Sequence, residues 1–386
     1  MSRCHAVVSM AALLASVCGQ DFLHYKFDST CFTEVVNYAT GPQAFPANGT
    51  LETTSAVSPW SNGRFGTGAL AGGSAATPTF YNRVRSGWDP SVQPLVGDLT
   101  MAWFMRERNP LTTSVTYLMG APSGGFRLFT NGVANRALVW REILASGGNN
   151  GVRDFQLPQA SADVQTLAQA GWVHVALVID ATAQTADWYI DGFPVFQLTG
   201  TGPATINRAG PFTIGYYSSA SPYDIDDFLL SNRAYSPVEV LQLALAPKAG
   251  DGDYLSGTTT QCGTVGLASY GGAPFLGNNG YGFDVLTSTT SFVLVYLGTD
   301  RCTLAGALPL PVDGGLLLPI AAGCQVLANF DVQLNGFAPG VPAQVPLPIP
   351  PASIFSGLTL YGQTALLDLG TGGVEVSNGL SLSLGF

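Results

Sequence analysis

Residues 171–192 read GWVHVALVIDATAQTADWYIDG, and their side chains alternate as they do along a β-strand. A second apolar run begins at Ala186, and Asp191-Gly192 is typical of the tight turn that joins two antiparallel strands. Neither side of the first run is polar enough to lie in water. We therefore predict an antiparallel meander in one layer of a β-sandwich. The residues that share one side are Val173, Val175, Leu177 and Ile179, and those of the other side are Trp172, His174, Ala176 and Val178.

The composition indicates an all-β protein with two domains. The chain has 386 residues, which is more than one ordinary hydrophobic core requires, and only 10% of them are charged. Glycine (47) and proline (25) are abundant, which favours short strands joined by many turns. The net charge of −10 repels phosphate, so nucleic acid and anionic lipid are poor candidate partners.

Residues 1–19 have the pattern of a secretory signal peptide. Arg3 precedes an apolar stretch at residues 6–17, which is too short to span a bilayer and is followed by small residues. We expect its cleavage and a secreted or cell-surface location. No later stretch is long enough to cross a membrane, because the apolar run at residues 316–324 is interrupted by Pro319.

Four cysteines would remain after this cleavage, and no pair of them has the CxxC spacing typical of a zinc site. An even number of cysteines in an exported chain indicates disulfide bonds, and four cysteines allow three complete pairings. The four are Cys31, Cys262, Cys302 and Cys324.

The stretch at residues 171–192 resembles the "W-x-H-V-A" strand and "Y-x-D-G" hairpin of laminin-G-like, concanavalin A-like jelly rolls. Four further blocks resemble the same family in the right order: HYKFDS at 24–29, GRFGTGAL at 63–70, LTMAWFMR at 99–106 and YDIDDFLLSNRAYSPVEVLQL at 223–243. The resemblance implies a jelly-roll sandwich at residues 21–247 that ends in a short helix near residues 235–246. It also implies that His174 is a structural residue of a strand.

The composition changes after Pro247. Residues 248–261 are polar and glycine-rich, which predicts a flexible linker, and the proline density of residues 262–386 favours a smaller β-sandwich. This half resembles a C-terminal β module recurrent in secreted bacterial proteins, for which no activity is established. That resemblance implies a Cys262–Cys324 disulfide. Because the linker separates their halves, we then expect Cys31 and Cys302 to be unpaired. The alternative is a Cys302–Cys324 bond, with Cys31 either joined to Cys262 or left as a buried free thiol.

The sequence contains no recognisable catalytic set. Glucanases of the concanavalin A-like fold carry "E-x-D-x-x-E" on one strand, and none of the six glutamates has a second carboxylate at that spacing. No G-x-S-x-G turn presents a serine. We therefore expect a protein that is not an enzyme.

Two binding sites are candidates. The acidic run YDIDD at 223–227, together with the family resemblance, suggests a Ca²⁺ site formed by Asp28, Asn37 and Asp226. The alternative is that Asp226 caps backbone groups. The loop TFYNRVRSGWDP at 79–90 combines aromatic and polar side chains, so Tyr81, Asn82 and Trp88 are candidate ligand contacts. The alternative is that these aromatics close one end of the sandwich.

These observations predict an exported, non-catalytic binding protein whose jelly roll recognises an extracellular glycan or protein surface. One alternative is a structural protein of an envelope or matrix that has no small ligand. The other is a divergent glycosidase, which would require one essential carboxylate.

Overall fold

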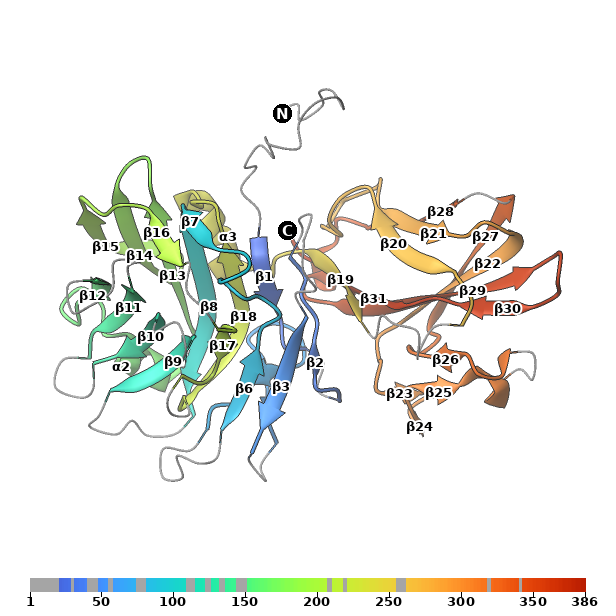
Figure 1. The fold of residues 1–386 in the computed structure, drawn as a ribbon, viewed down its shortest axis with the longest axis horizontal. Helices are drawn as coiled ribbons and strands as arrows, with labels where there is room; N and C mark the ends of the chain where they lie inside the picture. The colour runs from blue at the N-terminus through green and yellow to red at the C-terminus, as the bar shows by residue number, and fades with distance from the viewer. Residues whose placement is uncertain are drawn as a thin grey trace.

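The chain folds into two β-rich halves that lie side by side (Figure 1). The computed structural model describes residues 21–28, 31–39, 48–54, 58–73, 81–108, 115–121, 126–131, 136–143, 151–206, 210–217, 221–254, 262–317, 321–339 and 342–386. The predicted signal peptide lies outside these residues. No helix among the described residues is long and apolar enough to span a membrane. The all-β prediction is confirmed.

The N-terminal half is a sandwich of two antiparallel sheets with eight strands each. The first sheet has the order β15 (Phe193–Thr199), β14 (Thr185–Ile190), β13 (Val173–Asp180), β8 (Leu99–Glu107), β18 (Tyr223–Ser231), β5 (Ala69–Leu70) and β4 (Trp60–Ser61), with β1 (Asp21–Tyr25) beside β18. The second sheet has the order β12 (Val152–Leu157), β11 (Leu138–Ile143), β10 (Arg127–Thr130), β9 (Thr116–Gly120), β17 (Thr213–Ile214), β6 (Asn82–Arg85), β3 (Gly49–Thr53) and β2 (Glu34–Val35). A small pair, β7 (Leu95–Gly97) and β16 (Ala204–Ile206), lies apart from both.

The stretch at residues 171–192 forms the predicted meander of β13, β14 and β15. The side that carries Val173 and Val175 faces the core between the sheets, where Trp103, Trp140 and Trp188 are fully buried. The turn between β14 and β15 has a positive φ at both Asp191 (48°) and Gly192 (84°), as the predicted tight turn requires.

The other side of β13 is also buried, because a helix packs against the outer face of the first sheet. Helix α3 (Pro237–Leu245) begins with a capping box between Ser236 and Glu239, and its Val240 and Leu243 join a separate apolar cluster with Ala176. The predicted closing helix is therefore confirmed. A second helix, α2 (Val164–Ala170), is capped by Asp163 and was not predicted.

The C-terminal half also consists of packed sheets. Its larger sheet has six strands, in the order β19 (Gly250–Tyr254), β31 (Gly379–Ser383), β29 (Thr359–Asp368), β22 (Thr290–Gly298) and β27 (Val332–Pro339), with β30 (Val374–Val376) beside β29. A three-stranded sheet of β20 (Gly266–Tyr270), β21 (Gly282–Leu286) and β28 (Ala343–Pro346) shares its apolar core. The remaining elements are short: β23 (Thr303–Leu304), β24 (Leu308–Pro309), β25 (Val312–Asp313), β26 (Gln325–Val326) and the 3₁₀ turns Gly314–Leu316 and Ser353–Phe355.

The prediction of a flexible linker at residues 248–261 is wrong for its described part. Residues 250–254 form β19, which pairs along its whole length with β31 of the C-terminal sheet. Lys248 donates from Nζ to Asp21 and, at 2.7 Å, to Tyr235 Oη, so the segment before β19 is tied to the jelly roll. Residues 255–261 lie outside the described part of the chain. The two halves therefore meet at a junction that is held together by specific contacts.

Side chains from both halves fill this junction. Tyr38 Oη lies 2.6 Å from Ser381 Oγ, and Val36 and Tyr38 share an apolar cluster with Tyr254 and Tyr361. The guanidinium of Arg301, which is 1% exposed, lies 4.9 Å from the ring centre of Tyr254. The halves are thus packed against each other through a buried interface.

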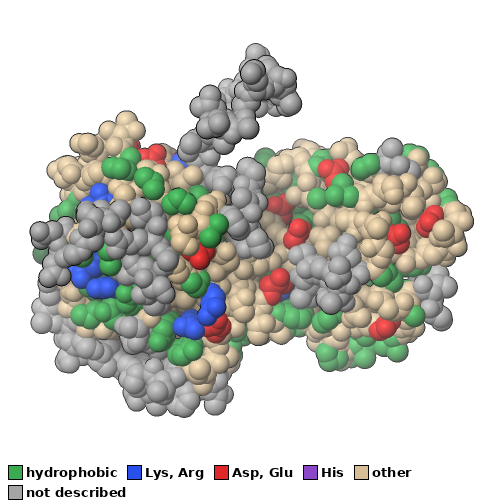
Figure 2. All heavy atoms as spheres, viewed as in Figure 1, with side chains coloured by type: hydrophobic (Ala, Val, Ile, Leu, Met, Phe, Trp, Pro, Cys, Tyr) green, Lys and Arg blue, Asp and Glu red, His purple; other side chains and the backbone are tan. Residues whose placement is uncertain are grey.

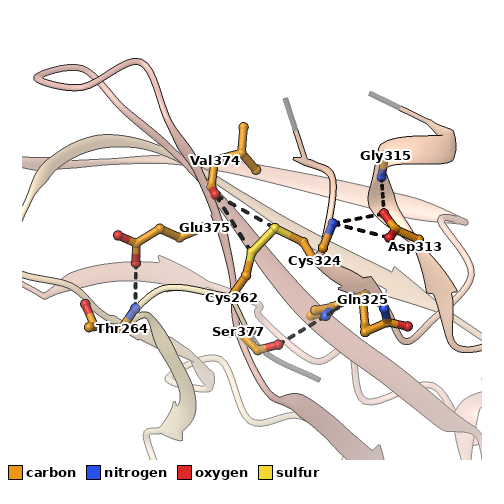
Figure 3. Close-up of a disulfide and its surroundings, with 11 residues drawn as sticks. Cys262, Thr264, Asp313, Gly315, Cys324, Gln325, Val374, Glu375 and Ser377 are labelled. Atoms are coloured by element: carbon orange, nitrogen blue, oxygen red, sulfur yellow. Dashed lines mark hydrogen bonds between the residues drawn. A yellow bond between two sulfur atoms is a disulfide. The ribbon is translucent and has the colours of Figure 1, made fainter. Parts of the chain in front are cut away.

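Two disulfide bonds are present. The predicted Cys262–Cys324 bond is confirmed, and Figure 3 shows it beside Val374 of β30. The expectation that Cys31 and Cys302 are unpaired is wrong, because they form the second bond with a Cα–Cα distance of 5.6 Å. The reason is the junction, which holds the two halves together where the linker was expected to separate them.

Candidate functional site

The predicted calcium ligands Asp28 and Asp226 lie on either side of one glycine-rich loop, residues 63–68. Asp226 Oδ2 accepts from the backbone N–H of Arg64 at 2.6 Å. Asp28 Oδ1 accepts from the N–H of Thr67 at 2.8 Å. Gly66 has a positive φ of 64°, and a Cβ at this residue would lie 2.0 Å from Asp28 Oδ1. The loop therefore wraps the two carboxylates with amide donors.

Burial dominates the titration of these acids. Together with the neighbouring charge of Asp227, it raises the pKa of Asp28 to about 7. Burial and the Asp227 charge also raise the pKa of Asp226 well above its ordinary value. Burial acts in the same direction on Asp227, but Lys26 Nζ at 3.2 Å lowers the pKa of that carboxyl below its usual range.

The third predicted ligand, Asn37, does not join them. Its Oδ1 accepts from His24 N at 2.7 Å, and its Nδ2 donates to Phe22 O at 2.9 Å, so the amide anchors β1. Ca²⁺ needs oxygen lone pairs that face the ion, whereas backbone N–H groups occupy those of Asp28 and Asp226. The residues present do not fit calcium, and the alternative that Asp226 caps the backbone describes the contacts. Across the described ranges, no group of three or more His, Cys, Asp or Glu side chains is arranged to hold a metal.

His24 and His174 meet at one small cavity, although they are distant in sequence. The cavity has a volume of about 10 Å³, and Asp227, Phe104 and Lys248 also line it. This volume suits roughly one water molecule. The two histidines therefore do not line a space that could admit a substrate.

Two of the three predicted ligand contacts are buried. Trp88 is 2% exposed, packs against Phe126 and Phe212, and donates from Nε1 to Gln93 O at 2.8 Å. Asn82 points inward from β6 and donates to Ala71 O at 3.1 Å. The prediction that these residues form an exposed contact surface is wrong. The alternative, that aromatic side chains close the sandwich, holds for Trp88.

Tyr81, the third predicted contact, lies on the outer face of the second sheet, half-buried in a row of tyrosines and arginines. The members come from β6 and the residue before it, from β9, β10 and β11, and from the residues that follow β17, and we call them the tyrosine–arginine face. They are Tyr81, Arg83, Arg85, Tyr117, Arg127, Phe129, Arg141, Tyr216 and Tyr217.

The guanidinium groups of this face lie over its aromatic rings. Arg83 lies 4.8 Å from the ring centre of Tyr81 and 5.0 Å from that of Tyr216. Arg127 lies 5.3 Å from the ring centre of Tyr217, and its Nη1 donates to Tyr217 Oη at 3.1 Å. Such contacts hold the planar cations in place and leave ring edges and N–H groups at the surface.

Each of the two acidic side chains beside these arginines pairs with them. Glu52 accepts from Arg83 Nε at 2.6 Å and also pairs with Arg85 at 3.0 Å. Asp154 accepts two bonds of 2.6 Å from Arg141. The face therefore keeps more positive than negative charge.

This combination suits the recognition of another molecule. Tyrosine and arginine are enriched at binding interfaces because each offers a rigid plane together with hydrogen-bonding groups. Helix α3 covers the outer face of the first sheet, and no described helix covers that of the second. The face is assembled from three distant segments, so only the alternation of Tyr81, Arg83 and Arg85 could have indicated it in the sequence.

Residues 90–241 match the model of a family described as the concanavalin A-like lectin/glucanases superfamily. The matched residues lie within the jelly roll, and the family resemblance of this half is confirmed. No curated protein matches the chain. The resemblance of residues 262–386 to a module of secreted bacterial proteins stays a prediction.

Several solved structures are similar to the chain at low sequence identity and low TM-score. Domain 4 of AbnA, a GH43 extracellular arabinanase from Geobacillus stearothermophilus solved with arabinotriose, is 18% identical, with a TM-score of 0.40 over 58% of this chain and 98% of its own. The binding domain of Paraclostridial Mosquitocidal Protein 1 is 13% identical, with a TM-score of 0.42 over 70% and 65%. The receptor-binding domain of botulinum neurotoxin type G is 10% identical, with a TM-score of 0.41 over 90% and 72%.

Proposed function

We propose that this chain, whose N-terminal half is a concanavalin A-like jelly roll, is an extracytoplasmic, non-catalytic protein that binds a glycan through the tyrosine–arginine face. The observation that carries the proposal is the cluster of half-buried tyrosines and arginines on the outer face of the second sheet. The two disulfide bonds support a location in an oxidising compartment.

The chemistry of the face suits a sugar chain. Tyrosine offers an apolar ring plane and a hydroxyl, and arginine offers up to five N–H donors for the many oxygens of a glycan. The rings of Tyr81 and Tyr216 are 4.7 Å apart, and those of Tyr117 and Tyr217 are 4.9 Å apart, so the tyrosines form two pairs along the sheet. A ligand can contact both pairs at once only if it is extended.

The test is binding of the full chain to an array of polysaccharides, followed by titration of each hit. Tyr81→Ala with Tyr216→Ala should weaken the binding of every hit at least tenfold. Tyr296→Ala is the matched control, because Tyr296 is a half-buried tyrosine of the C-terminal half whose ring centre lies 4.5 Å from that of Phe330. Equal binding by the double variant and the control would refute the role of this face.

A structural role without a small ligand is the second candidate. It is favoured by an exposed apolar pair on the C-terminal sheet, where Phe292 is 51% exposed, Phe337 is 52% exposed and their ring centres are 5.8 Å apart. Sedimentation would detect concentration-dependent self-association. Self-association that Phe292→Ser abolishes, together with silence on the array, would favour this role over glycan binding.

A divergent glycosidase remains the third candidate. Two of its glutamates are engaged in structure, since Glu142 pairs with Arg153 and Glu239 caps α3. Hydrolysis of an array hit that disappears on replacing one carboxylate would establish an enzyme and overturn the non-catalytic proposal.

A further inference from the structure

Three arginines of the tyrosine–arginine face share one row across the second sheet. Arg85 pairs with Thr213, which pairs with Gly120, and on the other side Gly120 pairs with Arg127. Arg127 in turn lies directly opposite Arg141 on the next strand. The row runs perpendicular to the strands, and its side chains share the outer face.

The row places like charges opposite each other on neighbouring strands. Like charges directly opposite each other on neighbouring strands destabilise a sheet, and Arg127 and Arg141 are such a pair. Only one carboxylate, Asp154, continues the row beyond Arg141. A negatively charged ligand across the row would relieve this repulsion.

The two middle positions of the row, Thr213 and Gly120, have a small side chain or none, whereas its ends are arginines. Thr213 is buried and donates from Oγ1 to Gly120 O at 2.8 Å, so its hydroxyl turns back to the backbone. Gly120 carries no side chain, and a Cβ there would lie 2.9 Å from the ring of Tyr217. The ring of Tyr217 therefore lies close against the backbone between Arg85 and Arg127.

The length of the row indicates an extended ligand. Arg85 and Arg141 are separated by four interstrand steps, which is about 19 Å at the usual strand spacing. Arg85 is 49% exposed and shares Glu52 with Arg83, so that one carboxylate serves two guanidinium groups. A single small anion could not reach both ends.

The row also stands out from the charge of the rest of the protein. From residue 251 to the end there are eight acids and one base, and that base, Arg301, is buried. In the face that Figure 2 shows, the Lys and Arg side chains gather on the jelly-roll half, whereas Asp and Glu side chains lie on both halves. The row is therefore a local concentration of positive charge on a chain whose net charge is −10, and a polyanion would be attracted to the row itself.

We propose that the arginine row Arg85–Arg127–Arg141 binds an acidic polysaccharide, one that carries carboxylate or sulfate groups, laid across the strands of the second sheet. This inference rests on the proposed glycan-binding function and narrows its ligand class. Guanidinium groups bind such groups through two parallel hydrogen bonds, and the tyrosines beside them contact the sugar rings.

The experiment compares two pairs of probes that differ in charge alone: polygalacturonate against its methyl ester, and dextran sulfate against dextran. We expect the full chain to bind the charged member of at least one pair, with affinity that falls steeply as salt is added. Arg127→Gln should weaken this binding about tenfold or more. Arg233→Gln is the matched control, because that half-exposed arginine pairs with Glu239 of α3 on the other side of the sandwich.

A gain-of-binding variant makes the test independent of any loss of folding. Asp154→Asn removes the acid that occupies Arg141, so it should tighten binding of the charged probe. Equal binding of charged and neutral probes would overturn the acidic class and leave the glycan proposal standing. If the chain bound none of the four probes and every hit on the array were a neutral glycan, the acidic ligand class would also be refuted and the glycan proposal would stand. If the chain bound no glycan at all, the proposed function itself would be overturned. If it bound a DNA duplex as tightly as the charged polysaccharide, the row would be a nonspecific anion-binding surface and the proposal would be overturned.

Discussion

The imidazole of His174 has an environment that suits packing and not chemistry. It is 1% exposed on the outer side of β13, and its ring centre lies 4.9 Å from that of Phe104. Burial lowers its pKa to about 3, so the ring stays neutral at physiological pH. The expectation that this histidine is structural agrees with these contacts.

We therefore expect His174→Gln to reduce the free energy of unfolding by about 1–2 kcal/mol, because an aromatic contact with Phe104 is lost in a packed layer. Urea denaturation would measure the change. Glycan binding by the folded variant should equal that of the unchanged protein. A folded variant that has lost binding would show that His174 belongs to the site.

Asp28 gives a prediction for pH. Its folded-state pKa of about 7 lies above the unfolded value of 3.8, so the folded protein holds this proton more tightly. The corresponding stability is present below about pH 4 and is lost as the pH rises through 7. Asp28→Asn removes this dependence and can still accept a bond from Thr67.

Denaturation of both proteins at several values between pH 5 and pH 8 should show Asp28→Asn gaining stability relative to the unchanged chain as the pH rises. The control is Asp284→Asn, at a half-buried aspartate that accepts from Gln344. Parallel curves for Asp28→Asn and the unchanged chain would contradict the raised pKa of Asp28.

The same buried acid provides the test for calcium. Because backbone N–H groups occupy Asp28 and Asp226, we expect millimolar calcium to leave the melting temperature unchanged. A rise that Asp226→Ala abolishes would restore the calcium prediction.

To predict ligand contacts from the sequence, one must know on which face of a strand each side chain lies. Asn82 and Trp88 were chosen from a loop-like composition, but Asn82 begins β6 and faces inward, whereas Tyr81 faces outward. A shift of one residue exchanges the two faces of a strand, so composition alone could not separate them.

At the scale of elements, the β14–β15 turn depends on Gly192. A Cβ at this residue would lie 2.7 Å from Leu241 Cδ1 of α3, and its φ of 84° strains any other residue. Gly192→Ala should lower the free energy of unfolding by about 2–4 kcal/mol, combining backbone strain with a clash against the helix.

Gly200→Ala separates these two causes. Gly200 also has a positive φ, of 71°, but a Cβ there meets nothing within 4 Å. Its replacement should cost only the backbone strain, about 1 kcal/mol. Equal losses for both variants, measured by thermal unfolding, would show that the packing of α3 against the turn contributes nothing.

The sequence predicted elements well where local chemistry specifies them. Ser236, Pro237 and Glu239 form a capping box that marks the start of α3 without reference to the rest of the chain. Helix α2 was missed because it spans only Val164–Ala170, which is too short to show a clear helical pattern in the sequence. Burial of Val164 and Ala168 against the rest of the fold stabilises it.

At the scale of the whole molecule, the Cys31–Cys302 bond closes a separation of 271 residues between the halves. Replacing both cysteines by serine should lower the free energy of unfolding by about 5 kcal/mol in the chain-entropy model. The halves should remain docked, because Tyr38 still contacts Ser381 and Arg301 still lies between aromatic rings. Calorimetry should therefore show a single transition at a lower temperature.

The contrasting variant replaces Cys262 and Cys324, which lie within the C-terminal half. Their bond closes a separation of 62 residues, so its loss should also cost stability but should leave the junction unchanged. Two separate transitions in the Cys31–Cys302 variant would show that the disulfide, and not the buried interface, holds the halves together.

The junction was the feature that sequence could least predict. Residues 248–254 are polar and rich in glycine, as flexible linkers are, yet Gly250 and Gly252 are needed because Tyr38 and Asn37 lie against their backbone. A linker and a close-packed strand can have the same composition. Only the three-dimensional contact between distant segments distinguishes them.

Strand β19 has a consequence for how such a protein can evolve. The strand leaves the jelly roll and completes the edge of the C-terminal sheet, while residues of the jelly roll fill the far side of the same junction. Recombination that cut the gene between the halves would expose the edge of β31 and the apolar side chains beneath it. A chain that carried either half alone would therefore need a different residue pattern at this edge.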